Sequence, residues 1–183
     1  MTLNDGLEAQ CRQAIADFRD GNISQEMLME RLDTYLAGPI IGYLTKMLSG
    51  RSYEDAEDIF QEVMIGLLRN HKNMDLKRPV VMPYVWSIVR SRAFDYLRRR
   101  ANEPFSPLPD VEPSSPDERV SRIEQEMEVA SVLNRLSPEE REVIVLTYWH
   151  NMTLKDISQT VGVPISTLAD RRQRALEKMR EMY

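Results

Sequence analysis

Five of the ten prolines lie between Pro104 and Pro116, and this cluster divides the chain. Proline lacks a backbone N–H and restricts φ, so the cluster belongs to neither a helix nor a central strand. The region is also acidic, because residues 101–140 carry ten acidic and three basic side chains. We therefore predict a flexible, semi-extended linker over residues 101–124. A chain of 183 residues is long enough for a small domain on each side of it.

The rest of the sequence has the pattern of an all-α protein. Apolar residues recur at intervals of three and four rather than in alternation, and there are only seven glycines. We predict two small helical domains joined by the linker. The predicted helices cover residues 4–20, 24–36 with a continuation to 48 after an interruption at Gly38-Pro39, 53–70, 83–100, 119–134, 138–150, 153–161 and 164–182. Ser137 and Thr153 are the predicted N-caps of two of these helices.

Several classes of protein are excluded by simple counts. No run of about 18 apolar residues is present, so the sequence predicts no transmembrane helix. The N-terminus lacks a basic segment followed by an apolar one, so no signal peptide is expected. Cys11, His71 and His150 lie too far apart in the sequence for zinc-ligand spacing, and we expect no metal and no cofactor. A single cysteine is typical of a reducing compartment, so a cytoplasmic protein is expected.

The net charge of -5 conceals two basic segments. Residues 87–100 carry five arginines and one aspartate, and residues 164–183 carry five basic and three acidic side chains. Acidic stretches flank and separate them. This arrangement is typical of a protein that holds nucleic acid at two places and keeps its linker away from it, although solvated helix faces would give the same counts.

The predicted helix 53–70 is strongly amphipathic. Its predicted buried stripe consists of Ala56, Ile59, Phe60, Val63, Leu67 and Leu68. Asp55, Asp58 and Glu62 recur on another face at intervals of three and four. Acidic residues in the first turn of a helix are stabilised by the helix dipole, and this stabilisation is a sufficient explanation for the presence of some of them. A catalytic carboxylate pair is not expected, because no histidine or glycine-rich loop accompanies them.

The predicted helix 83–100 combines arginines with aromatic residues. Val85, Ile88, Val89, Ala93, Tyr96 and Leu97 are expected to face a core. Arg90 and Arg98 then lie on one outer flank, and Arg92, Asp95 and Arg99 lie on another. Tyr84 and Trp86 lie at the start of the helix. Positive charge beside aromatic rings is typical of sites for unstacked, single-stranded bases, but Trp86 could equally fill the core.

The C-terminal stretch has the spacing of a helix-turn-helix. Ile157, Val161 and Leu168 are apolar where two helices must face each other, and Gly162 lies in the turn, where a positive φ favours glycine. The second helix starts with short polar residues and continues with long basic ones, as a helix in the major groove requires. Its candidate DNA-binding residues are Ser166, Thr167, Asp170, Arg171, Arg172, Arg174 and Lys178. A plain three-helix bundle with a basic face is the alternative.

Together these segments resemble bacterial RNA polymerase sigma factors of the extracytoplasmic-function group. DAEDIFQEVMIGLLRN is similar to the second conserved region, PYVWSIVRSRAFDYLRRR to the promoter-melting and -10-reading helix that follows, and LNRLSPEEREVIVLTYWHNMTLKDISQTVGVPISTLADRRQRALEKMRE to the fourth region. The resemblance implies an N-terminal extension over 1–29, a region 2-like domain over 30–100, the linker, and a region 4-like domain over 125–183. Residues 1–29 have no counterpart in the minimal pattern and would cover a surface or bind a regulator.

The resemblance implies a role for each group of residues. The acidic ridge would dock on the clamp helices of the largest core RNA polymerase subunit; it consists of Asp55, Glu57, Asp58, Gln61 and Glu62. The -10 set would hold the -10 element of promoter DNA, and the loop 71–83 would receive an extruded base; the set consists of Tyr84, Trp86, Arg90, Arg92, Asp95, Arg98 and Arg99. The -35 set would contact the -35 element; the set consists of Ser166, Thr167, Asp170, Arg171, Arg172, Arg174 and Lys178.

Core RNA polymerase and promoter DNA are the implied partners, with an anti-sigma factor or another regulator as a further one. No catalysis and no membrane insertion are implied. The chain departs from the pattern at Ser91, where asparagine is common, and at Arg172, where leucine is common. The alternative functions are a helix-turn-helix transcriptional regulator with a signal-sensing N-terminal domain, and a nucleic-acid enzyme. The first leaves the acidic ridge without a role, and the second lacks a metal or nucleophile constellation.

Overall fold

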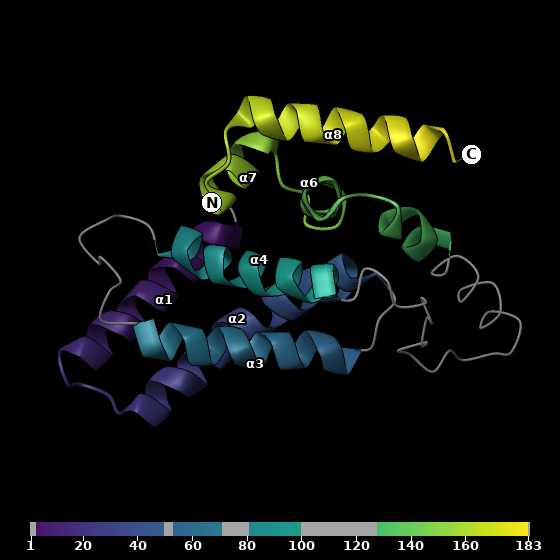
Figure 1. Ribbon diagram of the computed structural model, residues 1–183. Coiled ribbons are helices and arrows are strands. Elements are labelled where there is room, and N and C mark those ends of the chain that lie inside the picture. Colours follow the sequence, from purple (N-terminus) through teal and green to yellow (C-terminus); the bar gives the residue numbers. More distant parts are fainter. Residues whose placement is uncertain (1–2, 50–52, 71–80, 100–127, 183) are drawn as a thin grey trace, which may run out of the picture.

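Figure 1 shows the computed structural model of the chain, which describes residues 3–49, 53–70, 81–99 and 128–182. These residues contain no strand, and the predicted all-α fold is confirmed. The helices are α1 (Leu3–Arg19), α2 (Gln25–Leu48), α3 (Tyr53–Asn70), α4 (Met82–Arg99), α6 (Pro138–Tyr148), α7 (Leu154–Val161) and α8 (Ile165–Arg180), and residues 128–134 are also helical. The predicted linker 101–124, most of the loop 71–83 and the first part of the predicted helix 119–134 lie outside the described residues.

The predicted interruption at Gly38-Pro39 is wrong, because α2 continues through it as one helix. Proline inside a helix costs about 3 kcal/mol or more, since it removes a backbone hydrogen bond and crowds the preceding turn. Apolar side chains on both sides of it are fully buried, among them Leu36, Ile40 and Leu44, each 0% exposed. Burial of one such side chain contributes about 1.5–3 kcal/mol, so several together outweigh the proline.

An apolar layer between α2, α3 and α4 forms the core of the N-terminal half. The predicted stripe of α3 is confirmed at Ala56, Ile59, Phe60, Val63 and Leu67, which are buried, and Leu68 is partly buried. On α4 the expected Val85, Val89 and Ala93 are buried, and Ile88, Tyr96 and Leu97 are partly buried. A Cβ at Gly66 would lie 3.4 Å from Cγ2 of Ile88, so the two helices approach closely where the glycine has no side chain.

The N-terminal helix α1 packs on α2 and α4 and holds the start of α4. The Glu8 carboxylate accepts hydrogen bonds from the backbone N–H groups of Val81 and Met82, the second at 2.7 Å. The first N–H groups of a helix have no partner within it, and the helix dipole favours a negative charge there. Residues 1–29 therefore include a cap for the helix that carries the -10 set.

We expect Glu8→Ala to lower the free energy of unfolding by about 1 kcal/mol, the typical loss for an N-terminal cap. Glu8→Gln keeps one acceptor oxygen and should lose less. Gln10→Ala, at an exposed position of the same helix, is the control. Urea denaturation followed by circular dichroism measures all three. Equal losses for the two alanine variants would refute the capping role.

The C-terminal half contains the predicted helix-turn-helix. Ile157, Val161 and Leu168 are buried as expected, and Gly162 has a φ of 71° in the turn between α7 and α8. Both predicted caps are confirmed, since Ser137 and Thr153 each form a capping box with the acidic residue three positions later. In this half, α6 is buried over residues 140–146 because it contacts α2, α7 and α8.

The two halves of the chain pack directly against each other. Contacts join α2 to α6 and α4 to α7, so helices from either side of the linker share one surface. In Figure 1, α4 lies between α3 and the C-terminal helices. The predicted -10 helix therefore has one side toward α3 and another toward the helix-turn-helix.

Candidate nucleic-acid interface

The acidic ridge lies along α3, on the side opposite the apolar stripe. Glu57, Asp58, Gln61 and Glu62 are exposed, and Asp55 is half-buried. Glu62 forms an ion pair of 3.6 Å with Arg92 of α4. The structure thus presents the predicted ridge as one acidic surface, whose C-terminal end approaches the basic residues of α4.

The solvent-facing part of α4 carries four members of the -10 set. Arg92, Arg98 and Arg99 are exposed, and Asp95 is half-buried. Asp95 forms an ion pair of 3.6 Å with Arg98, and its carbonyl accepts a hydrogen bond from Nε of Arg99 at 3.3 Å. One aspartate therefore helps to orient two arginines whose guanidinium groups remain accessible to phosphate.

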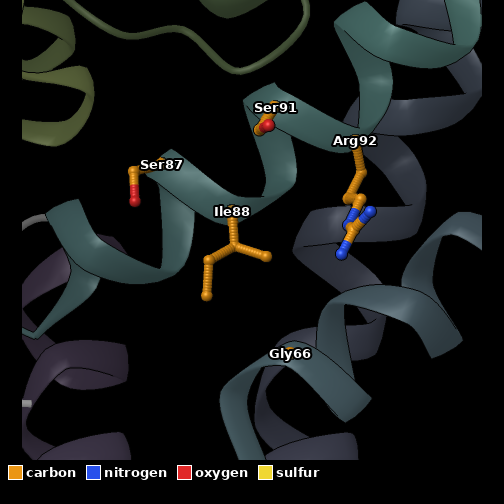
Figure 2. Close-up of a pocket in the computed structure, with 5 residues that line it drawn as sticks. All are labelled: Gly66, Ser87, Ile88, Ser91 and Arg92. Carbon is orange, nitrogen blue, oxygen red and sulfur yellow. The ribbon is translucent and has the colours of Figure 1, made fainter. Parts of the chain in front are cut away.

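A cavity of about 370 Å³ lies beside these arginines, between α3 and α4. Its lining residues are Gly66, Ser87, Ile88, Ser91 and Arg92. Figure 2 shows four of them projecting from α4 and Gly66 facing them from α3. Ser87 donates a hydrogen bond to the carbonyl of Tyr84 at 2.7 Å. The cavity combines two hydroxyls, a guanidinium and an apolar wall, which are groups suited to the edge and face of a nucleobase.

The other three members of the -10 set are partly or fully buried. Tyr84 is half-buried at the start of α4. Trp86 is 5% exposed and packs edge-on against Tyr43 of α2, with ring centroids 4.9 Å apart. The Arg90 side chain is 19% exposed, and its guanidinium lies 5.4 Å from the centre of the Phe94 ring. In this arrangement Trp86 and Arg90 are covered by other parts of the chain.

Arg90 forms a bidentate ion pair with Glu142 of α6. Its Nε lies 2.5 Å from Oε1, and Nη2 lies 2.9 Å from Oε2. The Tyr43 hydroxyl donates to Oε1 at 3.2 Å. Burial raises the pKa of the Glu142 carboxyl, whose side chain is 1% exposed, and the guanidinium of Arg90 opposes that rise. Burial also raises the pKa of Tyr43 well above its usual value, so Tyr43 remains a donor.

More contacts between the two halves surround this pair. Arg90 Nη1 donates to the carbonyl of Val161 at 3.3 Å, and Arg141 Nη1 donates to the carbonyl of Met47 at 2.7 Å. His150 lies against Tyr43 with ring centroids 6.2 Å apart, and burial lowers the pKa of its imidazole. The pKa of Arg90 is raised, because Glu142 outweighs the effect of its burial.

The -35 set is divided between two environments on α8. Ser166, Asp170, Arg174 and Lys178 are exposed, while Thr167, Arg171 and Arg172 are half-buried. Nη1 of Arg171 is buried without a hydrogen-bond partner, and the charge of Arg171 opposes the rise that burial causes in the pKa of Glu142. Lys178 donates to both carboxylate oxygens of Glu140, at 2.9 and 2.7 Å. Arg174 therefore presents the most accessible guanidinium of the set.

Sequence reasoning missed Glu142 and Tyr43. The available signal was a glutamate next to the apolar run Val143–Leu146, where a fully buried carboxylate requires a cation. Nothing in the sequence identified Arg90 as that cation. Among the described residues, no group of three or more histidine, cysteine, aspartate or glutamate side chains could hold a metal ion. Within the same residues, no helix has the length and apolar character needed to cross a membrane.

Two stretches of the chain match known family descriptions. Residues 32–103 match Sigma-70 region 2, and residues 132–181 match Sigma-70 region 4. The ECF RNA polymerase sigma factor RpoE of Cereibacter sphaeroides is 29% identical over 173 residues, which cover 92% of this chain and 91% of that protein. The ferric citrate uptake sigma factor FecI of Escherichia coli is 26% identical over 145 residues, which cover 76% of this chain and 82% of that protein.

The fold is also similar to that of two solved structures. The structure of CnrH in complex with the cytosolic domain of CnrY gives a TM-score of 0.65 at 20% identity, covering 98% of this chain and 96% of that one. The structure of the sigma factor RpoE in complex with the anti-sigma factor NepR from Bartonella quintana gives a TM-score of 0.58 at 19% identity, covering 83% of this chain and 94% of that one. At these identities the likeness concerns the fold alone.

Proposed function

The chain belongs to the sigma-70 family of RNA polymerase sigma factors, within the extracytoplasmic-function group, and on this premise we propose that it binds core RNA polymerase and directs it to promoters through -10 and -35 elements. The observation that carries the function is the match to both region 2 and region 4 in that order, together with the 91% coverage of a sigma factor relative. A helix-turn-helix regulator with a sensing domain would lack region 2.

The acidic ridge is the proposed binding surface for core polymerase. Its members lie on one side of α3, and four of the five are exposed. A basic partner surface would gain attraction along the part of this helix that carries the ridge. The -10 set is proposed to hold single-stranded promoter DNA, with the exposed arginines of α4 on phosphates and a base in the cavity beside Ser91 and Arg92.

The -35 set is proposed to enter the major groove with α8. Arg174 is the favoured base reader, because Arg171 is half-buried, and Lys178 is the favoured phosphate contact. We further propose that the chain acts in the cytoplasm without catalysis of its own. The anti-sigma factor in complex with one structural neighbour supports a protein regulator of this chain as well.

Co-purification with core RNA polymerase tests the proposed function. The full chain, carrying an affinity tag, is mixed with purified core enzyme and recovered. We expect core enzyme to elute with the chain in an equimolar amount. An excess of an established sigma factor should release core enzyme from the chain by competition. Failure to retain core, combined with tight binding of duplex DNA by the chain alone, would favour the regulator instead.

Substitutions in α8 should separate base reading from phosphate binding. An arginine paired with guanine contributes about 1–3 kcal/mol of discrimination, so Arg174→Ala should relax the preference at one or two adjacent base pairs of a -35 library. Lys178→Ala should weaken all sequences alike and reduce the salt slope by about one unit. The measurement is transcription with polymerase present. An unchanged profile for Arg174→Ala, merely scaled down, would show that α8 only clamps phosphates.

A further inference from the structure

The helix that carries the -10 set begins without a side-chain cap of its own. Val81 directly precedes α4, and Met82 and Pro83 are the first two residues of the helix, so none of these side chains carries an oxygen acceptor. Serine, threonine, aspartate or asparagine usually supplies one at this place. Because Pro83 has no backbone N–H, the donors that need a partner are the N–H groups of Val81 and Met82. The start of α4 therefore depends on an acceptor from elsewhere in the chain.

Glu8 of α1 supplies that acceptor. Its two carboxylate oxygens accept from the N–H groups of Val81 and Met82, the second at 2.7 Å, and the side chains of both residues are buried. We propose that Glu8 is a positioning residue for -10 recognition, because it fixes the first turn of α4 and with it the base site built on that turn. The proposal rests on the proposed function, which places a promoter base in the cavity between α3 and α4.

The helix α1 can position α4 because α1 is itself held on α2. Cys11 and Ile15 follow Glu8 at intervals of three and four on one face of α1, and both are buried in the core. Asp17 of α1 also forms an ion pair of 2.8 Å with Arg31 of α2. The Glu8 carboxylate therefore extends from a packed helix, and sites supported by helices are held more precisely than sites supported by loops.

A short series of hydrogen bonds joins this cap to the cavity. The Val81 carbonyl accepts from the N–H of Tyr84 at 3.0 Å, and the Tyr84 carbonyl accepts from the Ser87 hydroxyl at 2.7 Å. Ser87 lines the cavity together with Ser91 and Arg92 (Figure 2). A shift of the first turn would move the Ser87 hydroxyl relative to a bound base. Binding groups must be held to within about 0.5 Å of their productive positions, so loss of the cap should weaken base selection.

Transcription by core RNA polymerase with the full chain tests this role. Two template libraries, randomised at the -10 or the -35 element, are derived from a template that the wild-type chain selects. Glu8→Ala removes both acceptor oxygens, and Glu8→Gln keeps one. Ser24→Ala is the control for lost stability, because the Ser24 side chain caps α2 by accepting from the N–H of Met27 at 3.2 Å. Gln10→Ala is the control for substitution of α1, and circular dichroism sets a temperature at which each variant is folded.

We expect Glu8→Ala to reduce the discrimination between bases about fivefold at one or two adjacent positions of the -10 element, which corresponds to the loss of one helix cap. The affinity for core and the preference at the -35 element should not change, because neither the acidic ridge nor α8 is built on the first turn of α4. Glu8→Gln should lose less selectivity than Glu8→Ala. Ser24→Ala and Gln10→Ala should keep the wild-type preferences at both elements.

Combining Glu8→Ala with Ser87→Ala tests whether the cap acts through the first turn of α4. Ser87→Ala should itself relax the preference at the same positions. Substitutions that act through one shared contact have non-additive effects. The double variant should therefore be about as selective as Ser87→Ala alone. Losses that multiply would show that Glu8 acts independently of Ser87 and would overturn this route from the cap to the cavity.

A -10 preference in Glu8→Ala that is identical to that of Ser24→Ala would reduce Glu8 to a stabilising cap and overturn the proposal. Equal relaxation at the -10 and -35 elements would also overturn it, since a positioning residue for one site acts on that site. If Glu8→Ala does not fold, the comparison of Glu8→Gln with Ser24→Ala decides. A wild-type chain that selects no template with core refutes the sigma factor role, whereas a selective wild type with unchanged Glu8 variants refutes only the positioning role.

Discussion

Replacing Asp55 and Asp58 together by arginine is expected to abolish binding to core RNA polymerase while leaving the helical content intact. The two positions lie three residues apart on α3, so they project in similar directions. Reversal removes two attractive contacts and places two positive charges against a basic partner surface. Like charges across an interface cost several kcal/mol, so the dissociation constant should rise about 100-fold or more.

The matched control for this double reversal is Asp20→Arg with Glu30→Arg. Both residues are exposed in the same half of the chain, and the change in net charge is the same. Competition against a labelled sigma factor for core enzyme gives the affinity of each variant. If the α3 variant binds as tightly as the control, the acidic residues only stabilise their own helix through its dipole.

Trp86→Ala should lower the free energy of unfolding by about 3–5 kcal/mol, the usual loss when a buried tryptophan is truncated to alanine. Trp86 is 5% exposed and packs edge-on against Tyr43, so its removal leaves a cavity beside α2. Trp86→Phe keeps most of the apolar contact and removes the indole N–H that has no partner. It should therefore cost much less.

Urea denaturation monitored by circular dichroism measures both Trp86 variants. The comparison decides between two roles, because a residue used mainly for stacking on bases would tolerate alanine with little loss of stability. A loss below about 1 kcal/mol for Trp86→Ala, the range typical of substitutions outside the core, would contradict the packing role.

Local features of the fold were predictable from the sequence because their causes are local. Ser137 and Thr153 cap helices through their own neighbours, and Gly162 adopts a positive φ that other residues rarely accept. The apolar stripe of α3 follows from helical periodicity alone. The acidic ridge follows from the same periodicity, since whatever lies opposite a buried stripe is presented to solvent.

Features that depend on distant packing were not predictable. α2 continues through Pro39 only because the residues on both sides are buried against other helices. Arg90 and Glu142 are 52 positions apart, and no periodicity links them. The position of Trp86 was ambiguous for a similar reason, because its burial depends on packing against Tyr43 of α2, which is distant in the sequence.

Run-off transcription with purified core RNA polymerase on a promoter library is the most direct test of the sigma factor assignment. The chain alone or core alone should give no specific transcript. Together they should select templates that share two sequence elements, one near -10 and one near -35, and the double reversal at Asp55 and Asp58 should eliminate the signal. Transcription that is no more selective with the chain than without it would contradict the assignment.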